Sequence, residues 1–216
     1  MSYAVKEMFL TLQGEGARAG RRAVFLRFAG CNLWSGREAD RADAVCRFCD
    51  TDFVGTDGPG GGKFADADAV AAAAAALWGE TTGHRYIVLT GGEPMLQIDA
   101  ILVEKLHDQG FEIAIETNGT LPVDPGIDWV CVSPKAGSEV VQRRGNELKL
   151  VWPQPAPPLP GHTPDDMEHW DFAHFLLQPL DAEGQNEAHA TACIEFVMER
   201  PLWRLSLQNH KLVGLK

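Results

Sequence analysis

The sequence of 216 residues predicts an α/β fold, an incomplete and open TIM-like (β/α) barrel of about six parallel strands with few helices. Short apolar runs rich in Val, Ile, Leu and aromatic residues recur along the chain, as strands buried on both faces do. Helical segments separate several of these runs, which implies right-handed βαβ units. The chain is also short of the roughly 250 residues of a complete eight-stranded barrel.

The strand candidates continue from the first quarter of the chain to its end. AVFLRFA at residues 23–29 is the first strong one. The later candidates are residues 85–90, 111–117, 128–132, 147–152, 173–178 and 203–207. Before the first strand, residues 1–22 form a hairpin-like N-terminal extension in which residues 13–16 (QGEG) would make an irregular turn.

Helix signals lie between some of these strands. Asp66 can cap a helix over residues 67–78, which contains six consecutive alanines. Asp99 can cap a second helix over residues 100–109, and a third candidate covers residues 186–199. These helices would connect neighbouring parallel strands.

Two segments interrupt the alternation of strands and helices. Residues 56–62 (TDGPGGG) are rich in glycine and predict a flexible loop. Residues 153–164 contain six prolines and predict an extended connector.

Composition excludes several classes of protein. Hydrophobic residues make up 45% and charged residues 23%, as in ordinary globular proteins. The formal net charge of −11 argues against binding to a nucleic-acid backbone. The most apolar run, residues 69–78, is about half as long as the roughly 20 residues that span a bilayer. With no signal peptide visible at the N-terminus, we expect a cytoplasmic protein with reduced thiols and no membrane partner.

Three of the five cysteines form a cluster with metal-ligand spacing. Cys31, Cys46 and Cys49 follow the pattern C-x14-C-x2-C directly after the first strong strand. A structural zinc site takes four ligands. A cubane iron–sulfur cluster that is held by three cysteines leaves one iron open. The residues alone leave both kinds of centre open, while Cys131 and Cys193 are expected to be buried core thiols.

Polar residues follow several predicted strands where those strands end. The strand that ends at Thr90 continues into Gly91-Gly92-Glu93-Pro94, where two glycines allow close approach of a ligand and Glu93 could accept a ligand ammonium. Other strand ends carry polar residues at 116–119, 133–135 and 178–181, and Lys149 lies in the strand predicted at residues 147–152. Because the carboxyl ends of parallel strands meet at one edge, we expect these groups to share a site.

At these residues the sequence resembles the radical S-adenosylmethionine (SAM) superfamily. The spacing C-x14-C-x2-C resembles an expanded form of the superfamily's C-x3-C-x2-C loop, and residues 91–94 resemble its GGEP motif. The resemblance extends to the branch that makes a 7-deazapurine of the queuosine pathway, in the motifs at residues 9–16, 27–34, 46–52 and 204–211. It implies a single domain over residues 1–216 with an expanded cluster loop at residues 30–62.

The resemblance implies a site with three cofactors. Cys31, Cys46 and Cys49 would bind a [4Fe–4S] cluster, and Thr51 would coordinate Mg²⁺. The residues expected to contact SAM are Gly92, Glu116, Ser133, Pro134, Lys135, Gln178, Pro179, Leu180 and Asp181. The residues expected to bind substrate are Leu12, Gln13, Gly14, Glu15, Arg27, Thr90, His210 and, through its terminal carboxylate, Lys216.

The activity that the resemblance implies is that of a radical lyase. It would convert 6-carboxy-5,6,7,8-tetrahydropterin to 7-carboxy-7-deazaguanine with release of ammonia, through a 5′-deoxyadenosyl radical and without a catalytic protein acid or base. Arg27 could pair with the substrate carboxylate through two hydrogen bonds. A homodimer and a reductant such as a flavodoxin are further expectations. The alternatives are a SAM enzyme that activates a glycyl radical and a non-enzymatic zinc-binding module.

Overall fold

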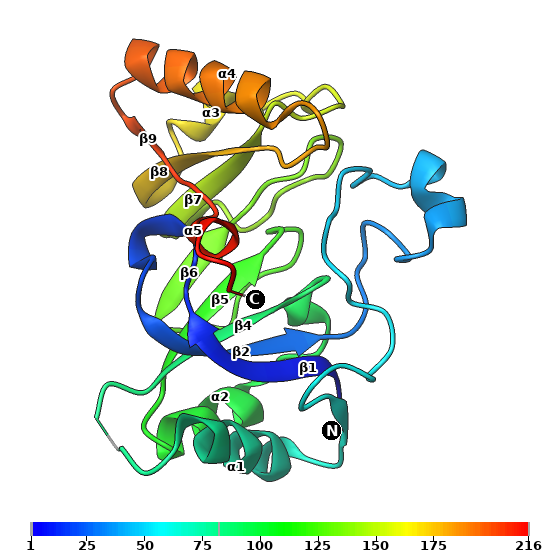
Figure 1. The fold of residues 1–216 in the computed structure, drawn as a ribbon, viewed down its shortest axis with the longest axis vertical. Helices are drawn as coiled ribbons and strands as arrows, with labels where there is room; N and C mark the ends of the chain where they lie inside the picture. The colour runs from blue at the N-terminus through cyan, green and yellow to red at the C-terminus, as the bar shows by residue number, and fades with distance from the viewer. Residues whose placement is uncertain (1, 82, 216) are drawn as a thin grey trace.

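The computed structural model describes residues 2–81 and 83–215, and their strands form one nine-stranded sheet (Figure 1). The strand order is β3-β1-β2-β4-β5-β6-β7-β8-β9. The strands are β1 (Tyr3–Leu12), β2 (Arg22–Phe28), β3 (Gly62–Phe64), β4 (Tyr86–Gly91), β5 (Glu112–Thr117), β6 (Trp129–Val132), β7 (Arg144–Trp152), β8 (Asp171–Pro179) and β9 (Trp203–Leu205). The helices are α1 (Ala67–Trp78), α2 (Ala100–Asp108), α3 (Pro164–Met167), α4 (Asn186–Glu199) and α5 (Asn209–Leu212).

The main part of the sheet is parallel, as the sequence predicts. Strand β2 and strands β4 to β9 pair in parallel from neighbour to neighbour, while β1 pairs antiparallel with both β2 and β3. In the described chain β3 and β9 are the edges, so the sheet stays open. The parallel part holds one strand more than the expected six because the short β9 continues it, although β9 ends at Leu205 and not at residue 207.

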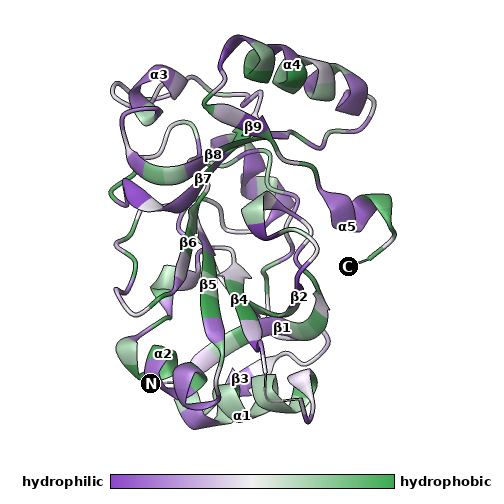
Figure 2. Cartoon of the chain, turned by 90° about the vertical axis from the view of Figure 1, so that its left-hand side faces the viewer, coloured by the Kyte–Doolittle hydropathy of each residue, from purple (hydrophilic) through white to green (hydrophobic). Residues whose placement is uncertain are grey.

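Two separate hydrophobic cores stabilise the two ends of this sheet. Helices α1 and α2 cover β1, β2, β4 and β5 at one end, where the core includes Leu26, Leu102 and Ile113. Helix α4 packs against β7, β8 and β9 at the other end around Trp203 and Leu177. The central strands are predominantly hydrophobic in Figure 2, as expected for parallel strands that are covered on both faces.

Both predicted helix caps are confirmed. The Asp66 carboxylate accepts a hydrogen bond from the Ala69 N–H at 2.9 Å, and the Asp99 carboxylate accepts one from the Leu102 N–H at 2.9 Å. Helix α2 ends at Asp108, one residue before the predicted end, and Gly110 follows with a positive φ of 77°. The two caps orient these helices against the same end of the sheet.

Two long irregular segments connect strands of the sheet. A short 3₁₀ helix, η2 (Glu38–Asp43), lies within the long loop between β2 and β3. The proline-rich connector begins after a cis peptide bond between Trp152 and Pro153 and ends in α3. Among the described helices, none has the length and apolarity that a membrane span requires.

Candidate active site

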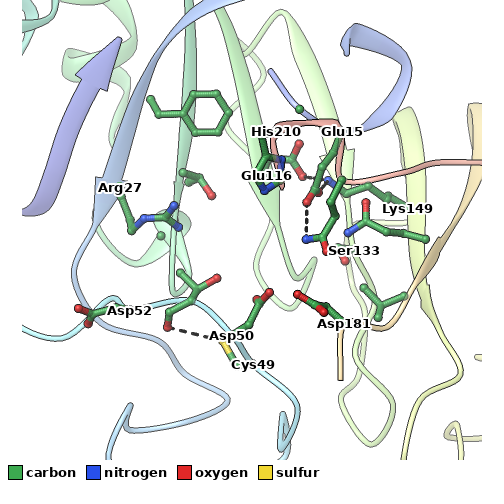
Figure 3. A pocket seen from close by; sticks show the side chains of 18 of the residues that line it. Glu15, Arg27, Cys49, Asp50, Asp52, Glu116, Ser133, Lys149, Asp181 and His210 are labelled. Atoms are coloured by element: carbon green, nitrogen blue, oxygen red, sulfur yellow. Dashed lines mark hydrogen bonds and ion pairs between the residues drawn. The ribbon is translucent and has the colours of Figure 1, made fainter. Parts of the chain in front are cut away.

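A cavity of about 570 Å³ lies inside the open barrel (Figure 3). The turn after β1, the cluster loop, the ends of β4 to β8 and the C-terminal segment all line it. The predicted residues that line it are Leu12, Gln13, Gly14, Glu15, Arg27, Cys46, Cys49, Thr51, Thr90, Gly92, Glu116, Ser133, Lys135, Gln178, Pro179, Leu180, Asp181 and His210. Cys31 and Pro134 are not in the lining, and Lys216 lies outside the described residues.

The cluster loop places Cys46 and Cys49 in the lining of this cavity. Cys31 and Cys49 pack against a small core of Trp34, Ala44 and Phe53. The Leu33 carbonyl accepts a hydrogen bond from the Cys46 N–H at 3.3 Å and so closes the insert between the first two cysteines. All five cysteines are unpaired, and Cys131 and Cys193 are buried as predicted.

The thiols of Cys46 and Cys49 interact directly. A hydrogen bond from Cys46 lowers the pKa of Cys49 to about 6, although burial opposes the shift, and the Thr51 backbone and Lys135 lower it further. The same hydrogen bond, together with burial, raises the pKa of the Cys46 thiol. Cys49 therefore has the thiolate character that a metal ligand requires.

In the described chain, the sulfur atoms of Cys31, Cys46 and Cys49 do not all lie within 4.8 Å of one another. Sulfur ligands of one tetrahedral zinc lie roughly 3.8 Å apart, given Zn–S distances of about 2.3 Å. In the described chain, the three residues that bring ligand atoms within 4.8 Å of one another are Glu116, Cys131 and Glu147, and not the three clustered cysteines. The Glu147 carboxylate already accepts hydrogen bonds from the Ala17 and Trp129 N–H groups at 2.7 and 2.8 Å.

The end of β4 touches the cluster loop directly. A Cβ atom at Gly92 would lie 2.2 Å from the Gly30 carbonyl oxygen and 2.6 Å from the Cys31 Cβ atom, so only glycine fits there. The backbone of Gly92 therefore borders both Cys31 and the cavity.

Glu93 has a structural role, and the expectation that it accepts a ligand ammonium is wrong. Its carboxylate is fully buried and accepts hydrogen bonds from the Met95 N–H at 3.0 Å and from the Thr117 hydroxyl and Asn118 N–H at 2.8 Å each. Its N–H donates to the Gly30 carbonyl at 3.0 Å. Glu93 thus ties the turn after β4 to the end of β5 and to the cluster loop.

Lys149, which the sequence places among the polar groups of the strands, is the centre of a buried charge network whose ion pairs the sequence did not predict. Its ammonium donates to Glu15 at 2.6 Å and to Glu116 at 2.8 Å. Burial opposes the charge, but the two carboxylates raise the pKa of Lys149 well above its usual value. Although burial acts in the opposite direction, Lys149, Gln208 and His210 lower the pKa of Glu15 to about 2. The sequence feature that indicates a buried and paired charge here is a lysine in the middle of the apolar run LKLVW.

Burial raises the pKa of Glu116, in spite of the Lys149 charge. The Gln13 amide donates to its other carboxylate oxygen at 3.3 Å. Glu15, Glu116 and Lys149 lie close together in Figure 3. Three elements, the turn after β1, β5 and β7, therefore meet at one ion-pair network.

The C-terminal segment completes the wall opposite β4. The Asn209 N–H donates to the Gly14 carbonyl at 2.9 Å, and the Gln208 amide donates to Glu15 at 2.9 Å. A Cβ atom at Gly14 would lie 2.1 Å from the His210 Nδ1 atom. The absence of a side chain at Gly14 therefore lets the His210 ring reach the cavity.

Charged residues beside Thr51 and Arg27 have partners already. Asp52 pairs with Lys6 at 2.9 Å, and Asp50 pairs with Lys211 at 3.1 Å. Lys211 also pairs with Asp181, which joins the cluster loop to the end of β8. The Arg27 Nε atom donates to Glu7 at 2.9 Å, and the guanidinium points into the cavity (Figure 3).

The strand ends opposite the cysteines offer polar groups to a ligand. The Lys135 ammonium donates to the Ser133 hydroxyl at 2.6 Å. In the part of the chain that the structure describes, the Gln178 Oε1 atom is buried without a hydrogen-bond partner. Because Gln178 lines the cavity, this unsatisfied acceptor fits a ligand donor there.

Comparisons with known proteins agree on one family. Residues 41–150 match the model of the radical SAM superfamily. The chain is 60% identical over 215 residues to 7-carboxy-7-deazaguanine synthase of Bordetella pertussis and 58% identical over 216 residues to that of Bradyrhizobium diazoefficiens, with all of both chains covered in each case. The crystal structure of QueE from Escherichia coli is 30% identical and superposes with a TM-score of 0.69, covering 97% of this chain and 95% of that chain.

The two synthases match the whole chain in sequence, and the QueE structure shares its fold. The superfamily implies a [4Fe–4S] cluster and SAM as cofactors. The three cysteines and the unsatisfied Gln178 acceptor provide groups suited to both. The chain belongs to the 7-carboxy-7-deazaguanine synthase family, the radical SAM carbon–nitrogen lyases of the queuosine pathway.

Proposed function

We propose that this chain binds 6-carboxy-5,6,7,8-tetrahydropterin in the barrel cavity and converts it to 7-carboxy-7-deazaguanine with release of ammonia. The observation that carries the proposal is the shared cavity of about 570 Å³, which residues of all three expected kinds line: cysteines, SAM contacts and substrate contacts. This volume is typical of small-molecule sites. Residues 1–216 would act as one domain, with the N-terminal hairpin and the cluster loop as opposite walls.

Cys31, Cys46 and Cys49 would hold the cluster through their thiolates. Cluster and SAM, when bound, supply the electron and the radical that start the reaction. The Gly92 backbone, Ser133, Lys135 and the Gln178 Oε1 atom would bind and orient SAM. The list of proposed SAM contacts is completed by Glu116, Pro134, Pro179, Leu180 and Asp181.

Arg27 would bind the substrate carboxylate. Glu7 accepts from the Nε atom of Arg27, and the two terminal nitrogens carry the remaining donors of the guanidinium. Glu15, which the network keeps ionised, would accept hydrogen bonds from N–H groups of the pterin. The remaining substrate contacts would come from Leu12, Gln13, Gly14, Thr90 and His210.

Thr51 would coordinate a Mg²⁺ ion that also contacts the substrate. Its hydroxyl is a hard oxygen ligand of the kind that Mg²⁺ prefers. Its neighbours Asp50 and Asp52 are engaged by Lys211 and Lys6, so substrate oxygens and water would supply the other ligands. The proposal also includes a homodimer, a reductant such as a flavodoxin, and contact between substrate and the Lys216 carboxylate. Extending the chain by one residue beyond Lys216 should raise the KM for the pterin if that contact exists.

An anaerobic assay tests the proposed function. Reconstituted protein with SAM, a reductant and the carboxytetrahydropterin should form 5′-deoxyadenosine in amounts that depend on the pterin. Cys49→Ala should abolish cluster binding and SAM cleavage, whereas Cys193→Ala, on the buried face of α4, should keep both. Uptake of zinc without iron and sulfide would support the zinc-binding alternative. SAM cleavage that ignores the pterin and requires a protein substrate would support the glycyl-radical alternative.

A further inference from the structure

Fourteen residues separate Cys31 from Cys46 in the cluster loop, whereas two separate Cys46 from Cys49. The short spacing restrains Cys46 and Cys49 relative to each other. The long spacing places no such local restraint on Cys31. Ordering such a loop costs conformational entropy. Contacts within the insert must therefore hold the three cysteines in one arrangement.

Arg41, in the short helix η2 of the insert, makes contacts in three directions. Its Nη1 atom donates to the Arg47 carbonyl at 2.8 Å and to the Cys49 carbonyl at 3.1 Å. Its Nε atom donates to the Glu38 carboxylate at 2.8 Å. Its guanidinium carbon lies 4.1 Å from the centre of the Trp34 ring. Only arginine combines a planar face for stacking with a fork of several donors.

Trp34 connects this arginine to the small core of the loop. It is 8% exposed, packs edge-on against Phe53 at 5.6 Å, and donates from its indole nitrogen to the Arg37 carbonyl at 3.1 Å. Cys31 and Cys49 pack against the same core. Arg41 therefore lies between this core and the backbone that carries Cys46 and Cys49.

The two later cysteines are fixed from different sides. The Cys46 N–H is held by the Leu33 carbonyl at 3.3 Å, on the strand side of the insert. The Cys49 carbonyl is held by Arg41, on the side of η2. The backbone around Cys49 is thus joined to η2 through the Arg41 side chain, which is 29% exposed. The Arg47 side chain adds a second link to the insert, because it donates to the Ala44 carbonyl at 3.2 Å.

We propose that Arg41 is a positioning residue for the iron–sulfur cluster: it fixes the Cys46–Cys49 backbone against the insert, and its charge favours the reduced form of the cluster. The proposal rests on the assignment of Cys31, Cys46 and Cys49 as cluster ligands. Hydrogen bonding and charge near a cluster set its reduction potential. Loss of a residue that orients ligands typically weakens a metal site about 10-fold to 100-fold.

Three variants of the full-length chain separate position from charge. Arg41→Gln removes both the fork and the charge. Arg41→Lys keeps the charge but cannot donate to two carbonyls while stacking on Trp34. Arg37→Gln, the matched control, removes the same charge from the same loop, and the Arg37 side chain makes no hydrogen bond or ion pair with the described residues.

Each variant is reconstituted anaerobically, and four quantities are measured: iron and sulfide per chain, the electron paramagnetic resonance spectrum of the reduced cluster, its midpoint potential, and the rate of iron loss to a chelator. We expect Arg41→Gln to lose iron about 10-fold faster than the unchanged protein, with an altered spectrum and a more negative potential. Arg41→Lys should keep the potential close to that of the unchanged protein but lose iron faster. Arg37→Gln should match the unchanged protein in all four.

The proposal is overturned if Arg41→Gln and Arg41→Lys keep the original chelator rate and spectrum, or if Arg37→Gln changes them equally. Circular dichroism of the cluster-free chains checks the barrel, which should stay folded because Arg41 lies outside both of its cores. If Arg41→Gln alone loses its fold, the rate of iron loss from Arg41→Lys tests the proposal instead. If the unchanged protein takes up no iron and sulfide, the assignment of the cysteines as cluster ligands fails. If the unchanged protein binds the cluster and the Arg41 variants bind it equally well, only the proposal for Arg41 fails.

Discussion

The Lys149 ammonium lies 2.6 Å from the Glu15 carboxylate, although the two residues are 134 positions apart in the sequence. Strand β7 carries the lysine, and the turn after β1 carries the glutamate. The turn is the segment proposed to bind the pterin, so one strand of the barrel orients a carboxylate that would face the substrate. Four predictions follow from this and neighbouring contacts.

Lys149→Met should destabilise the protein and impair its activity. The variant leaves Glu15 and Glu116 buried without their shared cation, which typically costs about 3–5 kcal/mol. Urea unfolding should show this loss, and kcat/KM for the pterin should fall at least about 10-fold because Glu15 loses its orientation. Lys211→Met removes an exposed lysine and should cost about 1 kcal/mol or less. Equal stabilities of the two variants would contradict this account.

The pH dependence of stability should show the Glu15 ion pair. The pKa of Glu15 falls from 4.5 to about 2 in the folded protein, so folding is favoured by its ionised form. The stabilisation is complete above pH 4.5 and is lost as the pH falls toward about 2. Comparison with Glu15→Gln should show a difference of up to about 3 kcal/mol at neutral pH. Urea titrations across this pH range measure the difference in free energy of unfolding between the two proteins. A difference that grows as the pH falls would contradict the prediction.

Gly14→Ala should damage substrate binding more than folding. The new methyl group would lie 2.1 Å from His210 Nδ1, so the imidazole must move away from the cavity. We expect the KM for the pterin to rise about 10-fold or more, with SAM binding unchanged. Gly83→Ala is the control, since a Cβ atom there meets nothing within 4 Å. A KM like that of the control would argue against a role of His210 in binding.

Gln154→Ala should weaken the binding of SAM. The Gln154 amide accepts from the Ala136 N–H at 2.6 Å and donates to the Pro134 carbonyl at 2.9 Å, on either side of Lys135. Without it the loop after β6 loses its tie to the proline-rich connector, and the Kd for SAM should rise about 10-fold. Gln185→Ala removes an amide that makes no cap hydrogen bond and should leave the Kd unchanged. Equilibrium dialysis under anaerobic conditions measures both.

The fold could be predicted from local signals because they agree with the tertiary structure. The alternation of apolar runs with capped helices predicts a parallel sheet, and the Asp66 and Asp99 caps are where the sequence places them. Strand ends shift by one to three residues, since pairing with a neighbour decides them: β7 begins at Arg144 because it pairs with β8 from Asp171 onward. Such long-range pairing leaves little trace in the local sequence.

The site could be predicted only where a residue belongs to a motif. The cysteines, Gly92 and Arg27 stand in such motifs, whereas the ion pairs and hydrogen bonds of Lys149 and Glu147 are recognisable only once distant segments meet. Glu93 shows the opposite case, because its place in a motif suggested contact with a ligand while its hydrogen bonds stay within the protein. The charge network that orients Glu15 is a property of the folded barrel.

The small core of the cluster loop is separate from the two cores of the barrel. Segments with their own limited packing can open while the rest of a protein stays folded. In the cluster-free protein, amide hydrogen exchange should therefore be faster in residues 30–62 than in β4 or β5. Iron and sulfide could then be installed after the barrel has folded, and loss of the cluster in air would leave a folded protein that can be reloaded.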